Sequence, residues 1–172
     1  MSLSDYPEFI EPLLDNLETL ITARYVSTST ALGHTLPAWA MIENSRRIDV
    51  EYPFLAIIPG RSQTPEGADG GVRQETFTVL FEVAITDADP KTATRKALRA
   101  MRTLDAVICS ATVAEMFANY STALHGPAYW QVLEHTPLVM RRLERTVNDD
   151  QQYLLVSQLI AEFKITEKTN YA

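Results

Sequence analysis

The chain has 172 residues, of which 46% are hydrophobic and 22% are charged, and these proportions are typical of a folded globular protein rather than a disordered one. Its 15 basic and 22 acidic residues give a net charge of −7, which argues against DNA or an anionic membrane as the main partner unless the cations are clustered. The single cysteine excludes an internal disulfide and a cysteine-based metal site. Without a linker, a signal peptide or a long apolar run, the sequence predicts one domain over residues 1–172 in a reducing cytoplasm.

An amphipathic helix is predicted near the start of the chain. Its apolar residues recur at helical spacing: Phe9, Ile10, Leu13, Leu14, Leu17, Leu20 and Ile21. An acidic row lies on the opposite side: Glu8, Glu11, Asp15 and Glu18. Residues 26–44 have a weak pattern with many Ser and Thr residues, and they are interpreted as a loop or short irregular structure.

Two strands and an intervening arm follow. Residues 47–60 are rich in β-branched and aromatic residues, and Pro53 among them implies an edge strand, a bulge or a late start at Phe54. Residues 61–73 contain Gly, Pro and polar residues, which predicts a flexible loop or arm. Residues 76–86 then alternate, so that only one face of this strand is expected to be fully buried. The apolar side consists of Phe77, Val79, Phe81, Val83 and Ile85.

A second helix is predicted to begin at Asp89 and Pro90, because an Asp side chain caps free N–H groups and Pro is tolerated in a first turn. The helical period places five apolar residues inward: Ala97, Leu98, Met101, Leu104 and Ile108. It places a row of cations outward, with Lys96 nearby: Lys91, Arg95, Arg99 and Arg102.

The C-terminal third predicts a hairpin. Residues 110–126 have no clear pattern, whereas residues 128–147 contain two short strands divided by Pro137. Residues 151–166 form a long strand, and the turn residues Asn148, Asp149 and Asp150 precede it. The predicted order is α-β-β-α-β-β. It indicates an α+β fold with an antiparallel or mixed sheet of about four to five strands and two main helices on one face.

The sequence contains no motif that predicts a catalytic, cofactor or metal site. His34, His125 and His135 are scattered, and the glycines of residues 67–71 lack the Gly-Lys-Ser/Thr of a phosphate loop. Asp87 with Asp89 resembles a metal-binding pair, but a turn followed by a helix cap explains both residues. Cys109 is expected to be a small buried residue rather than a nucleophile.

Three interpretations of the cationic row are open. It is a solvated helix face, a nucleic-acid surface, or the complement of the acidic row on the first helix. A nucleic-acid surface needs aromatic platforms or basic surroundings, and the chain is acidic overall. Contact between two different faces of identical copies is head-to-tail, and its repetition gives a closed ring or an open filament. The third interpretation therefore predicts a ring-forming module.

The layout resembles tail terminator or tail-completion proteins of long-tailed bacteriophages, the group of the lambda gpU type. After the N-terminal helix, the resemblance rests on the order and size of elements with the sequences YPFLAIIPG, ETFTVLFEVAITD, DPKTATRKALRAMRTLDAVI and YLLVSQLIAEFKI. It implies a non-enzymatic protein of the virion neck, assembled in the host cytoplasm. Such proteins form a ring, commonly of six subunits, that caps the tail tube and ends its polymerisation.

The resemblance also implies the partners: other copies of the chain, the tail tube protein, and a head connector or stopper protein. DNA passes through the ring without specific binding, and no membrane and no cofactor is involved. The residues expected at subunit or partner interfaces are Glu11, Asp15, Glu18, Arg61, Glu66, Asp69, Arg73, Lys91, Arg95, Arg99 and Arg102.

Two alternatives remain open at the level of the sequence. One is another head–tail connector, stopper or adaptor component, which shares small α+β modules and ring assembly. The other is a small ligand-binding or enzymatic domain, with a site assembled from aromatic residues and a histidine that are distant in the sequence: Trp39, Tyr129, Trp130 and His135.

Overall fold

The structure, a computed structural model, describes residues 10–44, 51–63, 72–116, 129–135, 139–147 and 152–168. Three helices and six strands lie in these ranges: α1 (Ile10–Ala31), β1 (Met41–Glu43), β2 (Phe54–Gln63), β3 (Val72–Asp87), α2 (Pro90–Cys109), α3 (Val113–Met116), β4 (Tyr129–His135), β5 (Val139–Val147) and β6 (Tyr153–Lys168). Within the described ranges, no helix combines the length and the apolar character needed to cross a membrane.

One mixed sheet organises the molecule. Its strand order is β1-β2-β3-β6-β4, and β5 also pairs with β6. β1 runs parallel to β2, whereas the other pairs are antiparallel. β3 and β6 pair along their whole length, from Val72 opposite Lys168 to Asp87 opposite Tyr153. β5 pairs with the first half of β6 and β4 with the second half, on the side away from β3. The α+β class and the closing hairpin are confirmed, with the short strand β1 as an addition.

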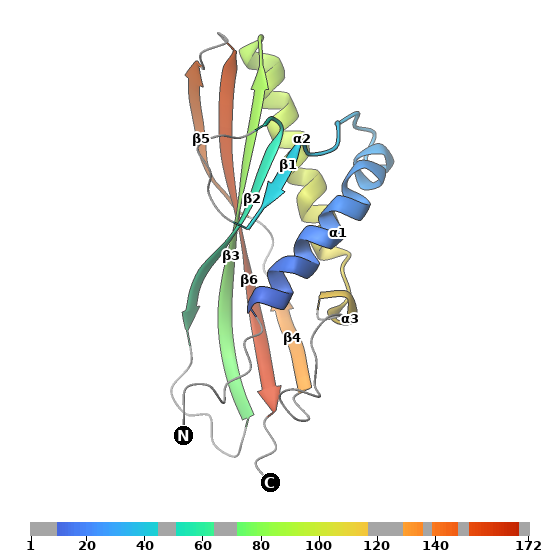
Figure 1. Ribbon diagram of the computed structural model, residues 1–172, viewed down its shortest axis with the longest axis vertical. Coiled ribbons are helices and arrows are strands. Elements are labelled where there is room, and N and C mark those ends of the chain that lie inside the picture. Colours follow the sequence, from blue (N-terminus) through green and yellow to red (C-terminus); the bar gives the residue numbers. More distant parts are fainter. Residues whose placement is uncertain are drawn as a thin grey trace.

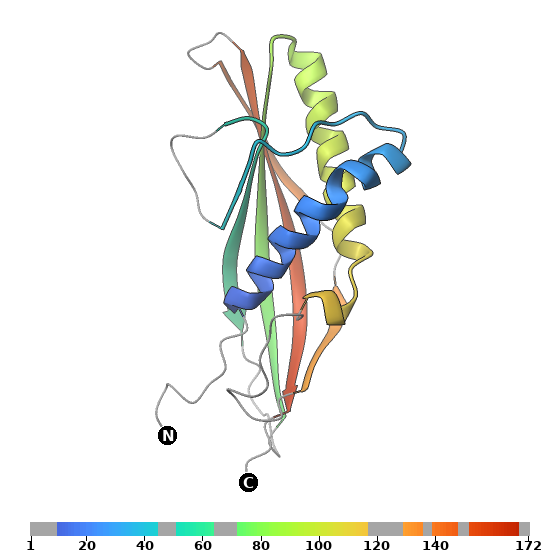
Figure 2. The ribbon, with the colours of Figure 1, turned by 45° about the vertical axis from the view of Figure 1, so that its right-hand side comes forward.

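Both long helices cover one face of this sheet (Figures 1 and 2). α2 contacts β3 and β6, while α1 packs on α2 and contacts β2. The core between the layers contains the side chains that the alternation of β3 predicts to be inward, and all of them are buried. The other strands contribute Leu55 and Ile57 of β2 and Leu155, Leu159, Ala161 and Phe163 of β6.

α1 is longer than the sequence predicts, because it continues through the Ser- and Thr-rich segment to Ala31. Ser and Thr hydroxyl groups often favour loops. In α1 they instead donate hydrogen bonds to carbonyls one turn earlier, as Thr30 Oγ1 does to the carbonyl of Val26 at 3.0 Å. Tyr25 and Ser29 are buried in this added part. The helix ends where Gly33 has a φ of 73°, and the N–H of His34 donates to the carbonyl of Ser29 at 2.9 Å.

α2 begins as predicted, with Asp89 as its N-cap and Pro90 in its first turn. Four of the five residues expected to face inward are buried. Leu98 is the exception, since 43% of its surface is exposed. Its position on the helix is between those of Arg95 and Arg102, on the outer side, so the prediction for Leu98 was wrong.

The arm predicted over residues 61–73 is partly strand. β2 begins at Phe54, in agreement with the late start that Pro53 implied, and it continues to Gln63. β3 begins at Val72. Residues 64–71, the middle of the predicted arm, lie outside the described residues.

Gly60 lies where β2 approaches β3 very closely. A Cβ atom at this position would be 2.6 Å from the carbonyl oxygen of Thr78. Substitution Gly60→Ala is therefore expected to lower the free energy of unfolding by about 1 to 3 kcal/mol, since the backbone of β3 must move. Urea denaturation measures this loss, with Pro59→Ala at the neighbouring exposed position as control. If Gly60→Ala is as stable as the wild type, the backbone of β3 moves away from the added Cβ atom without a loss of free energy, which would contradict this expectation.

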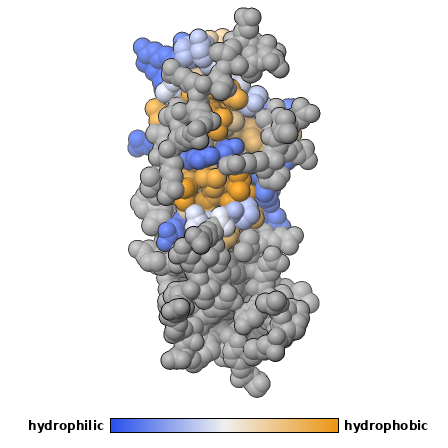
Figure 3. All heavy atoms as spheres, turned by 90° about the vertical axis from the view of Figure 1, so that its left-hand side faces the viewer, coloured by the Kyte–Doolittle hydropathy of each residue, from blue (hydrophilic) through white to orange (hydrophobic). Residues whose placement is uncertain are grey.

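The sheet face without helices carries a second apolar cluster (Figure 3). Phe54, Ala56 and Ala84 are buried there, with half-buried apolar neighbours around them: Met41, Tyr52, Ile58, Leu154 and Val156. A hydrophilic band divides the apolar area in Figure 3. On this face Gln158 Nε2 donates a hydrogen bond of 2.9 Å to Glu82 Oε2, which links β6 to β3.

Candidate interaction surfaces

The outer side of α2 carries four exposed cations in one row, which we call the cationic stripe: Lys91, Arg95, Arg99 and Arg102. At 1.5 Å per residue the stripe is about 16 Å long. None of the four side chains makes a hydrogen bond or ion pair with another residue of the described ranges. Their positions on the helix are opposite the buried stripe that includes Ala97. The exposed Leu98 adds an apolar side chain to the same surface.

Lys96 differs from these four cations. Its Nζ lies 2.6 Å from Asp87 Oδ2, and this bond lowers the pKa of the Asp87 carboxyl below its usual value. Asp89 Oδ2 accepts hydrogen bonds from the N–H and the hydroxyl of Thr92, at 2.8 and 2.6 Å, which lower the pKa of Asp89. The two aspartates therefore form a turn and a helix cap, in agreement with the sequence prediction.

Three carboxylates gather beside β1, and we call them the acidic patch: Asp15, Glu18 and Glu43. α1 contributes two of them and β1 the third, and Asn44 Nδ2 donates to Asp15 Oδ1 at 3.3 Å across the two elements. Partial burial, followed by the negative charges of Asp15 and Glu43, raises the pKa of Glu18. The protomer thus holds like charges together at one edge of its sheet.

The raised pKa of Glu18 predicts that Glu18→Gln stabilises the protomer at neutral pH. The raised pKa means that ionised Glu18 destabilises the folded state at neutral pH, and this cost vanishes below the ordinary value of 4.5, where the side chain is protonated in both states. The variant should raise Tm by a few degrees at most at neutral pH, because solvent screens the charges, and should match wild type in acid. Thermal unfolding against pH measures this, with the exposed Glu51→Gln as control. A lower Tm at neutral pH would contradict it.

The structure does not bring the acidic patch and the cationic stripe together within one protomer, since no ion pair joins them in the described ranges. The side chains of Glu11, Arg61 and Arg73 lie outside the described part, although their backbones belong to α1, β2 and β3. Glu66 and Asp69 lie outside it entirely. Their interface roles stay predictions. Glu43 was missed because its segment was interpreted as a loop.

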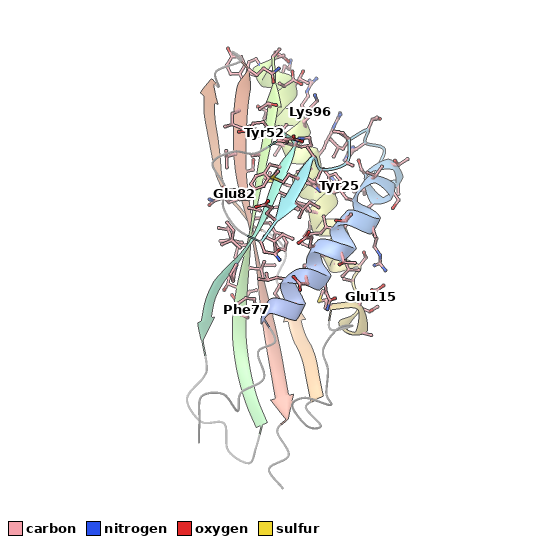
Figure 4. The ribbon with its side chains drawn as sticks, in the orientation of Figure 1. Tyr25, Tyr52, Phe77, Glu82, Lys96 and Glu115 are labelled. Atoms are coloured by element: carbon pink, nitrogen blue, oxygen red, sulfur yellow. The ribbon has the colours of Figure 1, made fainter. Side chains whose placement is uncertain are left out.

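A contact between α1 and α3 was also missed. Asn16 is buried, and its Nδ2 donates a hydrogen bond of 2.7 Å to the carbonyl of Met116. Arg24 forms an ion pair with Glu115, which lies on α3 beside α1 (Figure 4). Glu115 Oε2 also accepts from the N–H of Thr112 at 2.8 Å. The spacing Thr112-x-x-Glu115 is a capping box, so a sequence signal for this short helix was present.

A small cavity opens between the end of α1, the segment after it and the start of α2. Its volume is about 80 Å³, well below the ~300 Å³ and more of typical ligand pockets. Figure 4 shows Tyr25, Tyr52 and Lys96 in the same part of the molecule. The lining residues are Tyr25, Leu36, Pro37, Tyr52, Pro53, Ile85, Thr86 and Lys96.

The residues of the ligand-site alternative do not converge. Trp39 packs on Tyr25, with ring centroids 4.6 Å apart, in the segment before β1. Tyr129, Trp130 and His135 belong to β4 at the opposite edge of the sheet. The described structure therefore gives this alternative no shared site.

Cys109 is exposed at the last position of α2, so the prediction of a buried cysteine was wrong. Desolvation, the charge of Asp105 and a hydrogen bond to its carboxylate raise the pKa of the thiol to about 11. The thiol is consequently protonated at neutral pH and a weak nucleophile. Among the described residues, no group of three or more His, Cys, Asp or Glu side chains could hold a metal ion.

No protein-family model and no curated protein matches the sequence. Twenty-four chains of solved structures match the structure. One of them comes from a structure titled "Virion of native gene transfer agent (GTA) particle", with a TM-score of 0.41 and 12% sequence identity, covering 87% of this chain and 91% of that chain. A TM-score below 0.5 does not establish a shared fold.

Proposed function

We propose that this protein is a non-enzymatic structural component of a phage-like virion that acts as a tail terminator. In this role it forms a ring at the neck, caps the tail tube, ends its polymerisation and joins the tail to the head connector. The order and size of the elements support the proposal, because they resemble those of tail terminator proteins. The α+β fold agrees with this resemblance.

One observation carries the proposal: two surfaces of opposite charge do not meet within the protomer. The cationic stripe has no partner among the described residues, and in the acidic patch partial burial, followed by the charges of Asp15 and Glu43, raises the pKa of Glu18. Contact between a neighbour's cationic stripe and this acidic patch gives the cations partners and offsets the repulsion among the carboxylates. Because the two surfaces differ, the contact is head-to-tail, and its repetition with closure gives a ring.

The charges set the register and the association rate of this contact more than its strength. Exposed ion pairs contribute only about 0 to 1 kcal/mol each, and salt screens them. Apolar side chains must add affinity, and Leu98 within the stripe is one such side chain. The net charge of −7 also suits a ring through which DNA slides without binding, since like charges repel.

Light scattering and negative-stain imaging of the purified chain over a range of concentrations test the proposal. The expected result is a closed toroid with a central hole, of one defined mass. A monomer at every concentration, or open filaments without closure, would overturn the ring.

A second test distinguishes a tail terminator from a head-side stopper or adaptor. Purified rings are mixed with isolated tails and, separately, with DNA-filled heads. A tail terminator binds the tails, whereas binding to filled heads alone would identify a head-side component.

A further inference from the structure

The small cavity at the end of α1 is lined by a buried tyrosine whose hydroxyl has no hydrogen-bond partner among the described residues. Tyr25 is only 3% exposed, and no hydrogen bond joins its hydroxyl to another residue of the described ranges. The ring of Trp39 packs on Tyr25, and its Nε1 is also buried without a partner in the described part of the chain. Buried polar groups without partners cost free energy, and nearly all of them bind one. The cavity is therefore a candidate site for a hydrogen-bonding ligand.

The polar side chains around the cavity offer protons rather than acceptors. Burial raises the pKa of Tyr25, so its hydroxyl keeps its proton at neutral pH and can donate it. Lys96 is the one charged residue among the described residues that line the cavity. Its ammonium group has three donors, and Asp87 Oδ2 accepts one of them at 2.6 Å. Asp87 offsets part of the charge of Lys96 but does not line the cavity, so the lining favours an anionic acceptor.

The size of the cavity restricts the ligand to a small group. A volume of about 80 Å³ holds several atoms, since about 10–15 Å³ is enough for one water molecule. Most of the remaining lining is apolar, with Leu36, Pro37, Pro53 and Ile85. A carboxylate with a short apolar stem has this size and polarity, whereas a sugar or a nucleotide is too large.

We propose that this cavity binds one carboxylate group through the hydroxyl of Tyr25 and the ammonium group of Lys96. Two sources supply this chemistry: a free acid of the size of acetate, and an Asp or Glu side chain of another subunit. The second source rests on the proposed ring, whereas the site itself does not. Arg99 of the cationic stripe lies three residues after Lys96 on α2, so an acidic side chain that meets the stripe comes close to the cavity.

Thermal unfolding with acetate as the probe tests the site. The full chain, diluted below the concentration of ring assembly, is compared at neutral pH in about 100 mM sodium acetate and in sodium chloride of equal ionic strength. A dissociation constant on the order of 10 mM predicts a Tm that is about 3 to 6 °C higher in acetate. An equal Tm in the two salts would overturn the proposal, because the cavity then holds only water.

Two variants locate the effect in the cavity. Tyr25→Phe removes the hydroxyl and keeps the ring, while Lys96→Met removes the charge and keeps the apolar stem. Each is expected to lose most of the rise in acetate, and comparing the two salts within one variant cancels any change in its own stability. Ser27→Ala, which removes an exposed hydroxyl from the same part of α1, should keep the rise. An equal rise in Tyr25→Phe and wild type would be a general salt effect and would overturn the site.

A second arm distinguishes the two sources at concentrations where the wild type is in rings. If a neighbour's side chain occupies the cavity, acetate should lower the fraction of rings several-fold relative to chloride, and Tyr25→Phe should do the same in chloride. Rings that are indifferent to both changes assign the site to a free acid. A wild-type chain that forms no ring refutes the proposed function, while the acetate comparison still decides whether the site exists.

Discussion

Replacing Arg95 and Arg99 by glutamate is expected to convert the rings into protomers at concentrations where the wild type is assembled. The two positions are adjacent turns of the cationic stripe, and both side chains are exposed and unpaired within the described residues. Reversal replaces attraction to the neighbour's acidic patch by repulsion at every contact of the ring. A loss of 1.4 kcal/mol per contact raises the dissociation constant about tenfold, and two reversed charges are expected to reach at least this loss.

Sedimentation velocity at increasing salt checks this result. The matched control is Arg95→Lys with Arg99→Lys, which keeps both charges and should retain the ring. About 1 M salt should reduce the difference between wild type and the reversed variant, because it shortens the screening length to about 3 Å. Rings that survive the reversal unchanged would remove the stripe from the interface.

Truncation of Phe77 has the largest expected effect on the protomer. Phe77 is fully buried on β3, and its register partner on β6 is Phe163, which is also fully buried. Phe77→Ala should lower the free energy of unfolding by about 3 to 5 kcal/mol, through lost apolar burial and the cavity left behind. Domains of this size are stable by only about 5 to 15 kcal/mol, so a large part of the stability is lost.

Urea denaturation measures this change, and Leu98→Ala is the matched control. Leu98 is the exposed apolar residue of α2, and its truncation should change the stability of the protomer by about 0.5 kcal/mol or less. Equal losses for the two variants would contradict the burial of β3 and β6 under the helix layer, in which α2 contacts both strands.

Those parts of the fold that depend on local patterns could be predicted from the sequence. The alternation of β3 identified its buried side, and the Asp89-Pro90 pair located the start of α2. The outward position of the cationic stripe also follows from the helical period alone. Leu98 was wrongly predicted to face inward, because it follows buried Ala97 in the sequence. On the helix it lies on the same side as the cationic stripe.

Features that depend on contacts between distant segments could not be predicted. β1 has only three residues, and its pairing with β2 is parallel, so its sequence carries no signal of its own. Glu43 joins Asp15 and Glu18 only because that pairing places it beside α1. The hydrogen bond from Asn16 to the carbonyl of Met116 likewise joins residues one hundred positions apart. Half of the candidate interface, the stripe, was thus visible in the sequence, while the complete acidic patch was not.

The central claim is a head-to-tail contact between the acidic patch and the cationic stripe, and a mixing experiment tests it most directly. Asp15→Lys with Glu18→Lys reverses the patch, and Arg95→Glu with Arg99→Glu reverses the stripe. Each variant alone should remain a protomer in light scattering. An equimolar mixture should regain ring mass, because each reversed surface then faces a complementary one on the other variant. A mixture that stays at protomer mass, with both variants folded and the wild type in rings, would contradict the contact.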